Sequence, residues 1–303
     1  MNTIKTFTVC CLTVIAAFSA PAHAALRVLA CEPEWGALVQ ELGGPLVEVS
    51  VATTALQDPH QIQARPSLIA RTRNADLLVC TGAELEIGWL PVLLQQSGNA
   101  KLQPGQPAHF LAADFVPKLE VPTQLDRAQG DVHAAGNPHI QTDPRNIALV
   151  AAALVARLQQ LDAANAAAYR IRLQDFQQRW QQAVQRWSAQ AAPLKGVPVA
   201  SQHKAFGYLY QWLGLVEVAV LEPKPGVEPS VAHLQQVLAA LKAKPARLVV
   251  HAAYQDPRPS NWLQQNAGVP VVKLPFTVGG SERAKDLFSL FDDTLERLLA
   301  ATQ

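Results

Sequence analysis

Three histidines in turn-type segments are the residues of this chain best suited to chemistry. The segments are Gln57-Asp58-Pro59-His60, Gly136-Asn137-Pro138-His139 and Ser201-Gln202-His203-Lys204. Their Gly, Pro, Asp, Asn and Ser residues are typical of loops between regular elements. Neutral imidazole is the commonest protein ligand for zinc and related metals. A single loop histidine is usually only solvated, but three in corresponding places predict a metal site formed by His60, His139 and His203.

The elements expected to position these loops alternate between strand and helix from residue 26 onward, which predicts parallel sheets covered by helices. The expected strands are Leu26–Cys31, Leu46–Thr53, Asp76–Cys80, His109–Ala112, Val197–Ser201, Val216–Leu221, Arg247–His251 and Val269–Leu274. The expected helices are Glu34–Leu42, Pro66–Asn74, Ile87–Gln96, Phe206–Leu213, Val231–Ala243, Ser260–Asn266 and Arg283–Ala301. Ligands of open α/β sheets bind beyond the carboxyl ends of the strands. The three histidine loops are therefore expected to meet at a cleft there.

The middle of the chain reads as a helical connector. Residues 145–191 contain no Gly and are rich in Ala, Gln, Leu and Arg, which are mostly strong helix formers. One apolar stripe repeats in steps of three and four: Tyr169, Leu173, Phe176, Trp180, Val184 and Trp187. It predicts a helix over Asn165–Ala189, about 37 Å long at 1.5 Å per residue, with Asp162 as its cap after a break at Leu161. We interpret the two tryptophans as packing residues.

The resulting architecture is α/β, with two Rossmann-like lobes joined by a long rigid connector helix. We place a leader in residues 1–24, the N-terminal lobe in 25–143, the connector in 144–193 and the C-terminal lobe in 194–303. Such an arrangement predicts a cleft between two lobes tied by a rigid helix, rather than a flexible hinge.

The first 24 residues have the composition of a secretory signal peptide. Lys5 supplies the positive start, Phe7–Ala20 an apolar core, and Ala22-His23-Ala24 a small-residue cleavage site. We predict export to the periplasm with cleavage after Ala24, and no acyl anchor. No later stretch reaches the roughly 18 apolar residues of a membrane helix, so the mature protein is expected to be soluble.

Composition and charge exclude several classes of protein. The chain has 303 residues, of which 49% are hydrophobic and 16% charged, which is too apolar for a disordered protein. Its 25 basic and 24 acidic side chains nearly cancel, so a nucleic-acid partner is not expected. Cys31 and Cys80 remain after the leader, each at the end of an apolar run. In an oxidising compartment they are expected to form a disulfide, with two buried free thiols as the alternative.

Several motifs along the chain together identify a resemblance. They are Asp58-Pro59-His60 followed by Pro66-Ser67; Ala75 to Gly82 leading to Glu84 and Glu86; Asn137-Pro138-His139-Ile140 followed by Asp143-Pro144; His203-Lys204-Ala205-Phe206 followed by Tyr208; and the Leu161 to Asn165 break with Tyr169. The sequence resembles the cluster A-I solute-binding proteins of metal-importing ABC transporters, particularly the zinc-specific members. The resemblance covers essentially the whole mature chain.

The resemblance implies that His60, His139 and His203 are metal ligands. The manganese and iron branches typically have a carboxylate where His203 stands, so a third imidazole favours zinc, in agreement with the preference of zinc for nitrogen donors. Many members supply a fourth ligand from an Asp in a loop near the end of the second domain, but residues 274–280 of this chain hold no carboxylate. We expect water there, with Glu282, Asp58 and Thr277 as alternatives.

The remaining candidates are assigned lesser roles. Glu84 and Glu86 are expected on the helix after the third strand, as structural or partner-facing residues. His133 could be an auxiliary or capture ligand, because it lies six residues from His139. His251 is expected in the core or beside the ligands, whereas His233 and His109 are expected to be unrelated to metal.

The function that follows is periplasmic zinc binding and delivery of the zinc ion to the membrane permease of an ABC importer, by a monomer. Alternatives are a manganese- or iron-binding homologue and a periplasmic zinc chaperone. A zinc-dependent hydrolase would also use three histidines and an open position. No HExxH or comparable catalytic spacing accompanies the histidines, so we expect no enzyme and no catalytic residue.

Overall fold

The computed structural model describes residues 24–123, 130 and 133–303. The predicted signal peptide therefore lies outside the described residues, apart from Ala24. Among the described residues, no helix is long and apolar enough to cross a membrane.

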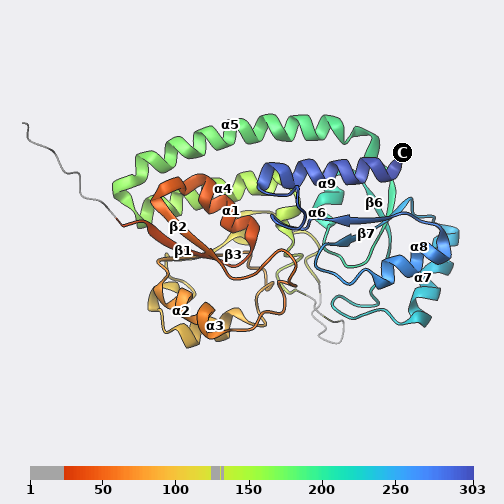
Figure 1. The fold of residues 1–303 in the computed structure, drawn as a ribbon, viewed down its shortest axis with the longest axis horizontal. Helices are drawn as coiled ribbons and strands as arrows, with labels where there is room; N and C mark the ends of the chain where they lie inside the picture. Colours follow the sequence, from red (N-terminus) through yellow and green to blue (C-terminus); the bar gives the residue numbers. More distant parts are fainter. Residues whose placement is uncertain (1–23, 124–129, 131–132) are drawn as a thin grey trace, which may run out of the picture.

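The first sheet is parallel throughout and has the strand order β2-β1-β3-β4. Its strands are β1 (Leu26–Ala30), β2 (Val47–Val51), β3 (Leu77–Cys80) and β4 (His109–Leu111). Alternate residues of each strand enter separate cores. Val28 and Val79 pack on the side of α1 (Pro33–Gly43), whereas Leu29 and Leu78 pack on the side of α2 (Pro66–Asn74) and α3 (Leu90–Ser97). Helices thus cover both faces, as strands buried on both sides require (Figure 1).

The second sheet repeats this plan with the order β6-β5-β7-β8, again parallel. Its strands are β5 (Pro198–Ser201), β6 (Val216–Val220), β7 (Leu248–Ala252) and β8 (Val271–Leu274). The helices are α6 (Gly207–Leu213), α7 (Val231–Ala243), α8 (Arg258–Ala267) and α9 (Leu287–Thr302). The expected α/β class with two parallel sheets is confirmed. Each expected strand begins and ends within two residues of the bounds of an observed strand.

Two long helices connect the sheets: α4 (Pro144–Leu161) and α5 (Ala166–Gln190). Helix α5 runs along both lobes (Figure 1). Its buried Trp180 and Trp187 lie against α9, with ring centroids 4.9 Å from Phe288 and 5.1 Å from Phe291, respectively. The packing role predicted for the two tryptophans is confirmed. Short 3-10 turns complete the chain: η1 (Gly44–Leu46), η2 (Ala100–Leu102), η3 (Ala112–Phe115), η5 (Ile140–Thr142), η6 (Ala163–Asn165) and η7 (Ala192–Leu194).

Two local predictions are wrong. Asp162 does not cap α5, because the turn η6 intervenes; its carboxylate instead accepts hydrogen bonds from Asn165 and from the Tyr169 hydroxyl, both at 2.8 Å. Glu84 and Glu86 do not lie on a helix. Ala83 and Glu84 have φ angles of 49° and 68°, left-handed values that a helix cannot contain, and α3 begins only at Leu90.

The predicted disulfide between Cys31 and Cys80 is present, with the two Cα atoms 4.7 Å apart. It joins the carboxyl ends of the neighbouring strands β1 and β3. The disulfide therefore fixes the carboxyl edge of the first sheet, the edge at which β2 ends and the loop carrying His60 begins.

Candidate metal centre

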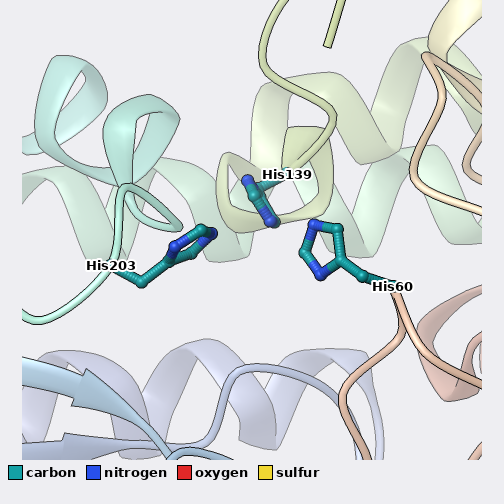
Figure 2. A group of neighbouring side chains, drawn as sticks. All are labelled: His60, His139 and His203. Carbon is teal, nitrogen blue, oxygen red and sulfur yellow. The ribbon is translucent and has the colours of Figure 1, made fainter. Parts of the chain in front are cut away.

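The three predicted ligands converge from separate loops (Figure 2). His60 lies between β2 and α2, His139 directly before η5 and α4, and His203 two residues after β5. Their ring centroids are 5.5 Å (His60 to His139), 5.8 Å (His60 to His203) and 5.4 Å (His139 to His203) apart. Two imidazoles on a tetrahedral zinc, with Zn–N bonds of about 2.0–2.1 Å, would place their centroids roughly 5 Å apart. One ring nitrogen from each lies within 4.8 Å of the other two. The spacing fits a shared ion.

Each ring is oriented through its Nδ1 atom. Nδ1 of His60 lies 2.7 Å from Asp58 Oδ1, Nδ1 of His139 lies 2.8 Å from Asn137 Oδ1, and Nδ1 of His203 lies 2.7 Å from Glu222 Oε2. Oxygen acceptors of this kind fix the tautomer with the proton on Nδ1. Each Nε2 therefore carries a free lone pair.

The three Nε2 atoms are buried and have no hydrogen-bond partner among the described residues. Buried polar atoms are almost always paired, because desolvation without a partner costs about 1–3 kcal/mol each. Burial, reinforced by His203 and His60, lowers the pKa of His139 well below its ordinary value and keeps that ring neutral. Three neutral donors around one point are a set that a bound cation would satisfy.

Two of the histidines are placed by the same local motif. In both Asp58-Pro59-His60 and Asn137-Pro138-His139, the side-chain oxygen of the first residue accepts the main-chain N–H of the histidine, at 3.0 and 2.9 Å. The intervening proline has a fixed φ, which limits the turn to few conformations. The Trp89 indole donates to Pro59 O, and the Tyr208 hydroxyl donates to Asn137 O, each at 2.8 Å. The turns are thus held from outside as well.

None of the protein groups considered for a fourth position completes the set. Asp58 is occupied by His60. The buried Thr277 hydroxyl donates to Glu34, and Glu282 is exposed in the loop before α9. Of the searched Asp, Glu, His and Cys side chains in the described part of the chain, only the three histidines form this group.

The other histidines lie in different settings. Nδ1 of His251 lies 3.0 Å from Ala252 O at the end of β7, and Nδ1 of His109 lies 2.8 Å from Leu102 O. His233 lies on α7. His133 is near the centre: its ring stacks on that of His60 with centroids 5.4 Å apart, and lies 6.4 Å from that of His139.

Two cavities flank the group. The larger, about 580 Å³, is lined by His60 and His203 together with Asp58, Glu222, Tyr254 and Trp262. The smaller, about 170 Å³, is lined by His133, His139 and His203. The centre therefore lies between the lobes, as predicted for the cleft.

Three glutamates of the first lobe are buried: Glu32, Glu34 and Glu86. Glu86 accepts the main-chain N–H groups of Thr81 and Gly82 at 2.7 and 3.0 Å, whereas Glu34 on α1 accepts the hydroxyl of Thr277 after β8. Burial raises the pKa of Glu34 and of Glu86 to about 7, and it raises the pKa of Glu32 well above its ordinary value. No periodicity in the sequence indicated that these acids are buried.

Comparison with known proteins also relates this chain to metal-binding proteins. The family model described as "Zinc-uptake complex component A periplasmic" matches residues 28–301. The manganese ABC transporter substrate-binding lipoprotein PsaA of Streptococcus pneumoniae is 21% identical over 280 residues, which is 90% of this chain and 87% of the relative. The zinc-binding lipoprotein AdcA of Streptococcus pneumoniae (strain ATCC BAA-255 / R6) is 23% identical over 275 residues, 87% of this chain and 53% of the relative. The iron ABC transporter substrate-binding lipoprotein MtsA of Streptococcus pyogenes serotype M1 is 22% identical, over 86% of this chain and 82% of the relative.

Solved structures share the fold. The crystal structure of ZnuA superposes with a TM-score of 0.76 at 22% identity, covering 92% of this chain and all of that chain (100%). A manganese-bound periplasmic metal-binding protein from candidatus liberibacter asiaticus gives a TM-score of 0.74 at 16% identity, with the same 92% coverage of this chain and 100% of the other. At these identities the likeness establishes the two-lobed fold.

Proposed function

Because this chain belongs to the family of zinc-uptake complex component A proteins, we propose that it binds a zinc ion through His60, His139 and His203 and delivers it to an ABC importer. The observation that carries the proposal is the set of three buried Nε2 atoms without partners, each aimed by an acceptor on Nδ1. The family consists of substrate-binding proteins and not of enzymes, so the hydrolase alternative is set aside.

Zinc is proposed over manganese and iron from the chemistry of the donors. The named relatives bind manganese, zinc or iron, so the family leaves the metal open. Three imidazole nitrogens and no carboxylate in the group favour zinc, since manganese prefers oxygen-rich sites. Asp58 and Glu222 add negative charge behind two of the rings, which supports binding of a divalent cation.

The proposed setting is the periplasm, after removal of the leader, with the membrane permease of the importer as partner and a monomer as the working form. The family, described as a periplasmic component of a zinc-uptake complex, supports this setting. A periplasmic zinc chaperone would share the same site. Zinc uptake into vesicles that carry the permease and its ATPase separates the two roles, because a chaperone would not stimulate it.

The central test is competition titration of metal-free mature protein and of three variants, His60→Ala, His139→Ala and His203→Ala. Each is expected to bind zinc at least tenfold more weakly, about 1.4 kcal/mol. His109→Ala is the matched control, since its ring bonds only Leu102 O, and it should match the parent. If all three site variants bind zinc like the parent, the ligand assignment is wrong. If the parent prefers manganese in the same titration, the assignment of zinc is wrong but the assignment of the ligands stands.

A further inference from the structure

A fourth imidazole stands beside the three-histidine group. The ring of His133 lies 5.4 Å from that of His60 and 6.4 Å from that of His139, and the side chain lines the same small cavity as His139 and His203. The first of these spacings matches the 5.4–5.8 Å found among the three ligands themselves. His133 is therefore within reach of the position that they share.

The backbone around His133 is held against the N-terminal lobe by Glu84. The Glu84 carboxylate accepts the main-chain N–H of Ala134, the residue after His133. Glu84 and the preceding Ala83 both adopt left-handed backbone angles, with φ of 68° and 49°. Such angles cost of order 1 kcal/mol or more for non-glycine residues and tend to persist where the surroundings require them. The contact with Ala134 thus ties His133 to the turn after β3, with its ring beside that of His60.

The surroundings of the His133 ring suit ligation. The three Nε2 atoms of His60, His139 and His203 are buried and have no hydrogen-bond partner among the described residues, and His133 lines the cavity next to them. An imidazole nitrogen from His133 would complete the set of four donors that zinc prefers.

We infer that His133 supplies the fourth ligand and closes a four-imidazole tetrahedral site, an inference that rests on the proposed zinc-binding function. Glu282, Asp58 and Thr277, the protein alternatives, are exposed or engaged elsewhere. To bind, the ring must leave its stack on His60 and turn toward the three Nε2 atoms, a movement of one side chain. Four nitrogen donors leave no position for a water, which suits a carrier better than a hydrolytic centre.

The test compares the parent, His133→Ala and His133→Gln by zinc competition and by the visible absorption of bound cobalt(II), which reports its donor set. We expect both variants to bind zinc at least tenfold more weakly and to change the cobalt bands, because water replaces a nitrogen. His109→Ala is the matched control and should leave both readouts unchanged. Unchanged cobalt bands in the His133 variants overturn the inference, whatever their zinc affinity.

The same experiment separates this inference from the proposed function. If the parent binds zinc and the His60→Ala variant loses it while His133→Ala does not, only the role of His133 fails. If the parent itself binds no zinc, the proposed function fails with it.

Discussion

The two Asp/Asn-Pro-His turns hold their histidines through contacts made within three residues, so the ligand and its orienting group come together in the sequence. His203 is different. Its Nδ1 partner, Glu222, follows the neighbouring strand β6, 19 residues along the chain. Parallel strands bring their carboxyl ends to one edge of the sheet, and this contact exists only because β5 and β6 pair. The orientation of His203 therefore depends on the fold of the second lobe.

We predict that Glu222→Gln weakens zinc binding about tenfold, at the lower end of the 10–100-fold loss typical of groups that orient a metal ligand. The amide can still accept the Nδ1 proton, so the loss measures the charge that makes His203 a better donor. Competition titration near neutral pH gives the value. Glu228→Gln is the control, because Glu228 lines the same cavity without a hydrogen bond to a ring among the described residues. An equal loss in both variants would show a general charge effect instead.

Zinc affinity should also fall as the pH drops below about 6.5, the ordinary pKa of an imidazole, because protons compete with the metal for the lone pairs. Burial lowers the pKa of His139 well below its ordinary value, so that ring stays neutral into the acid range. Competition titrations from about pH 8 to pH 5 test this. An affinity that stays constant across the range contradicts ligation by histidine.

At the scale of the elements, composition and periodicity predicted those helices and strands that have one clear sequence pattern. The connector stripe predicted α5, and the apolar runs predicted the strands, since both depend on local spacing. The segment from Gly82 to Trp89 was predicted less well. Its left-handed residues and its contact with Ala134 depend on a loop some 50 residues away, which no local pattern records. The buried Glu34 escaped prediction for the same reason, because its partner Thr277 lies 243 residues further along the chain.

The contact between α1 and the loop after β8 leads to a prediction about pH and stability. Burial raises the pKa of Glu34 to about 7 in the folded protein, whereas an unfolded glutamate titrates near 4.3. The folded state therefore holds the proton more tightly, and this group lowers the free energy of unfolding as the pH rises from about 4.3 to about 7. Glu34→Gln removes that penalty, since the amide is neutral and can still accept the Thr277 hydroxyl.

Urea unfolding of metal-free protein at about pH 5 and pH 8 measures the effect. We expect Glu34→Gln to raise the free energy of unfolding relative to the parent, and we expect this increase to be larger at pH 8 than at pH 5. Glu48→Gln on the exposed side of β2 is the control and should show no such difference. If the Glu34→Gln difference is the same at both pH values, the carboxyl does not titrate in this range and is not held protonated by burial.

At the scale of the whole molecule, the proposed ion would join loops from both lobes. His60 comes from a loop of the first sheet and His203 from a loop of the second, while His139 lies near the end of the first lobe, shortly before α4 (Figure 2). The lobes already share α5, which packs on both α1 and α9. Zinc would thus add a second tie between the lobes besides the shared helix, and its binding energy should appear directly as folding stability.

Zinc at a thousandfold excess over its dissociation constant should raise the free energy of unfolding of the parent by about 4.1 kcal/mol. In His203→Ala the two remaining ligands, His60 and His139, both belong to the first lobe, so the tie between the lobes is lost. A tenfold weaker site at the same zinc concentration would then give about 2.7 kcal/mol or less. Denaturant unfolding with and without zinc measures both values, and His109→Ala should match the parent. Equal stabilisation of His203→Ala and the parent would mean that zinc binds within one lobe, and that the position between the lobes is not the binding site.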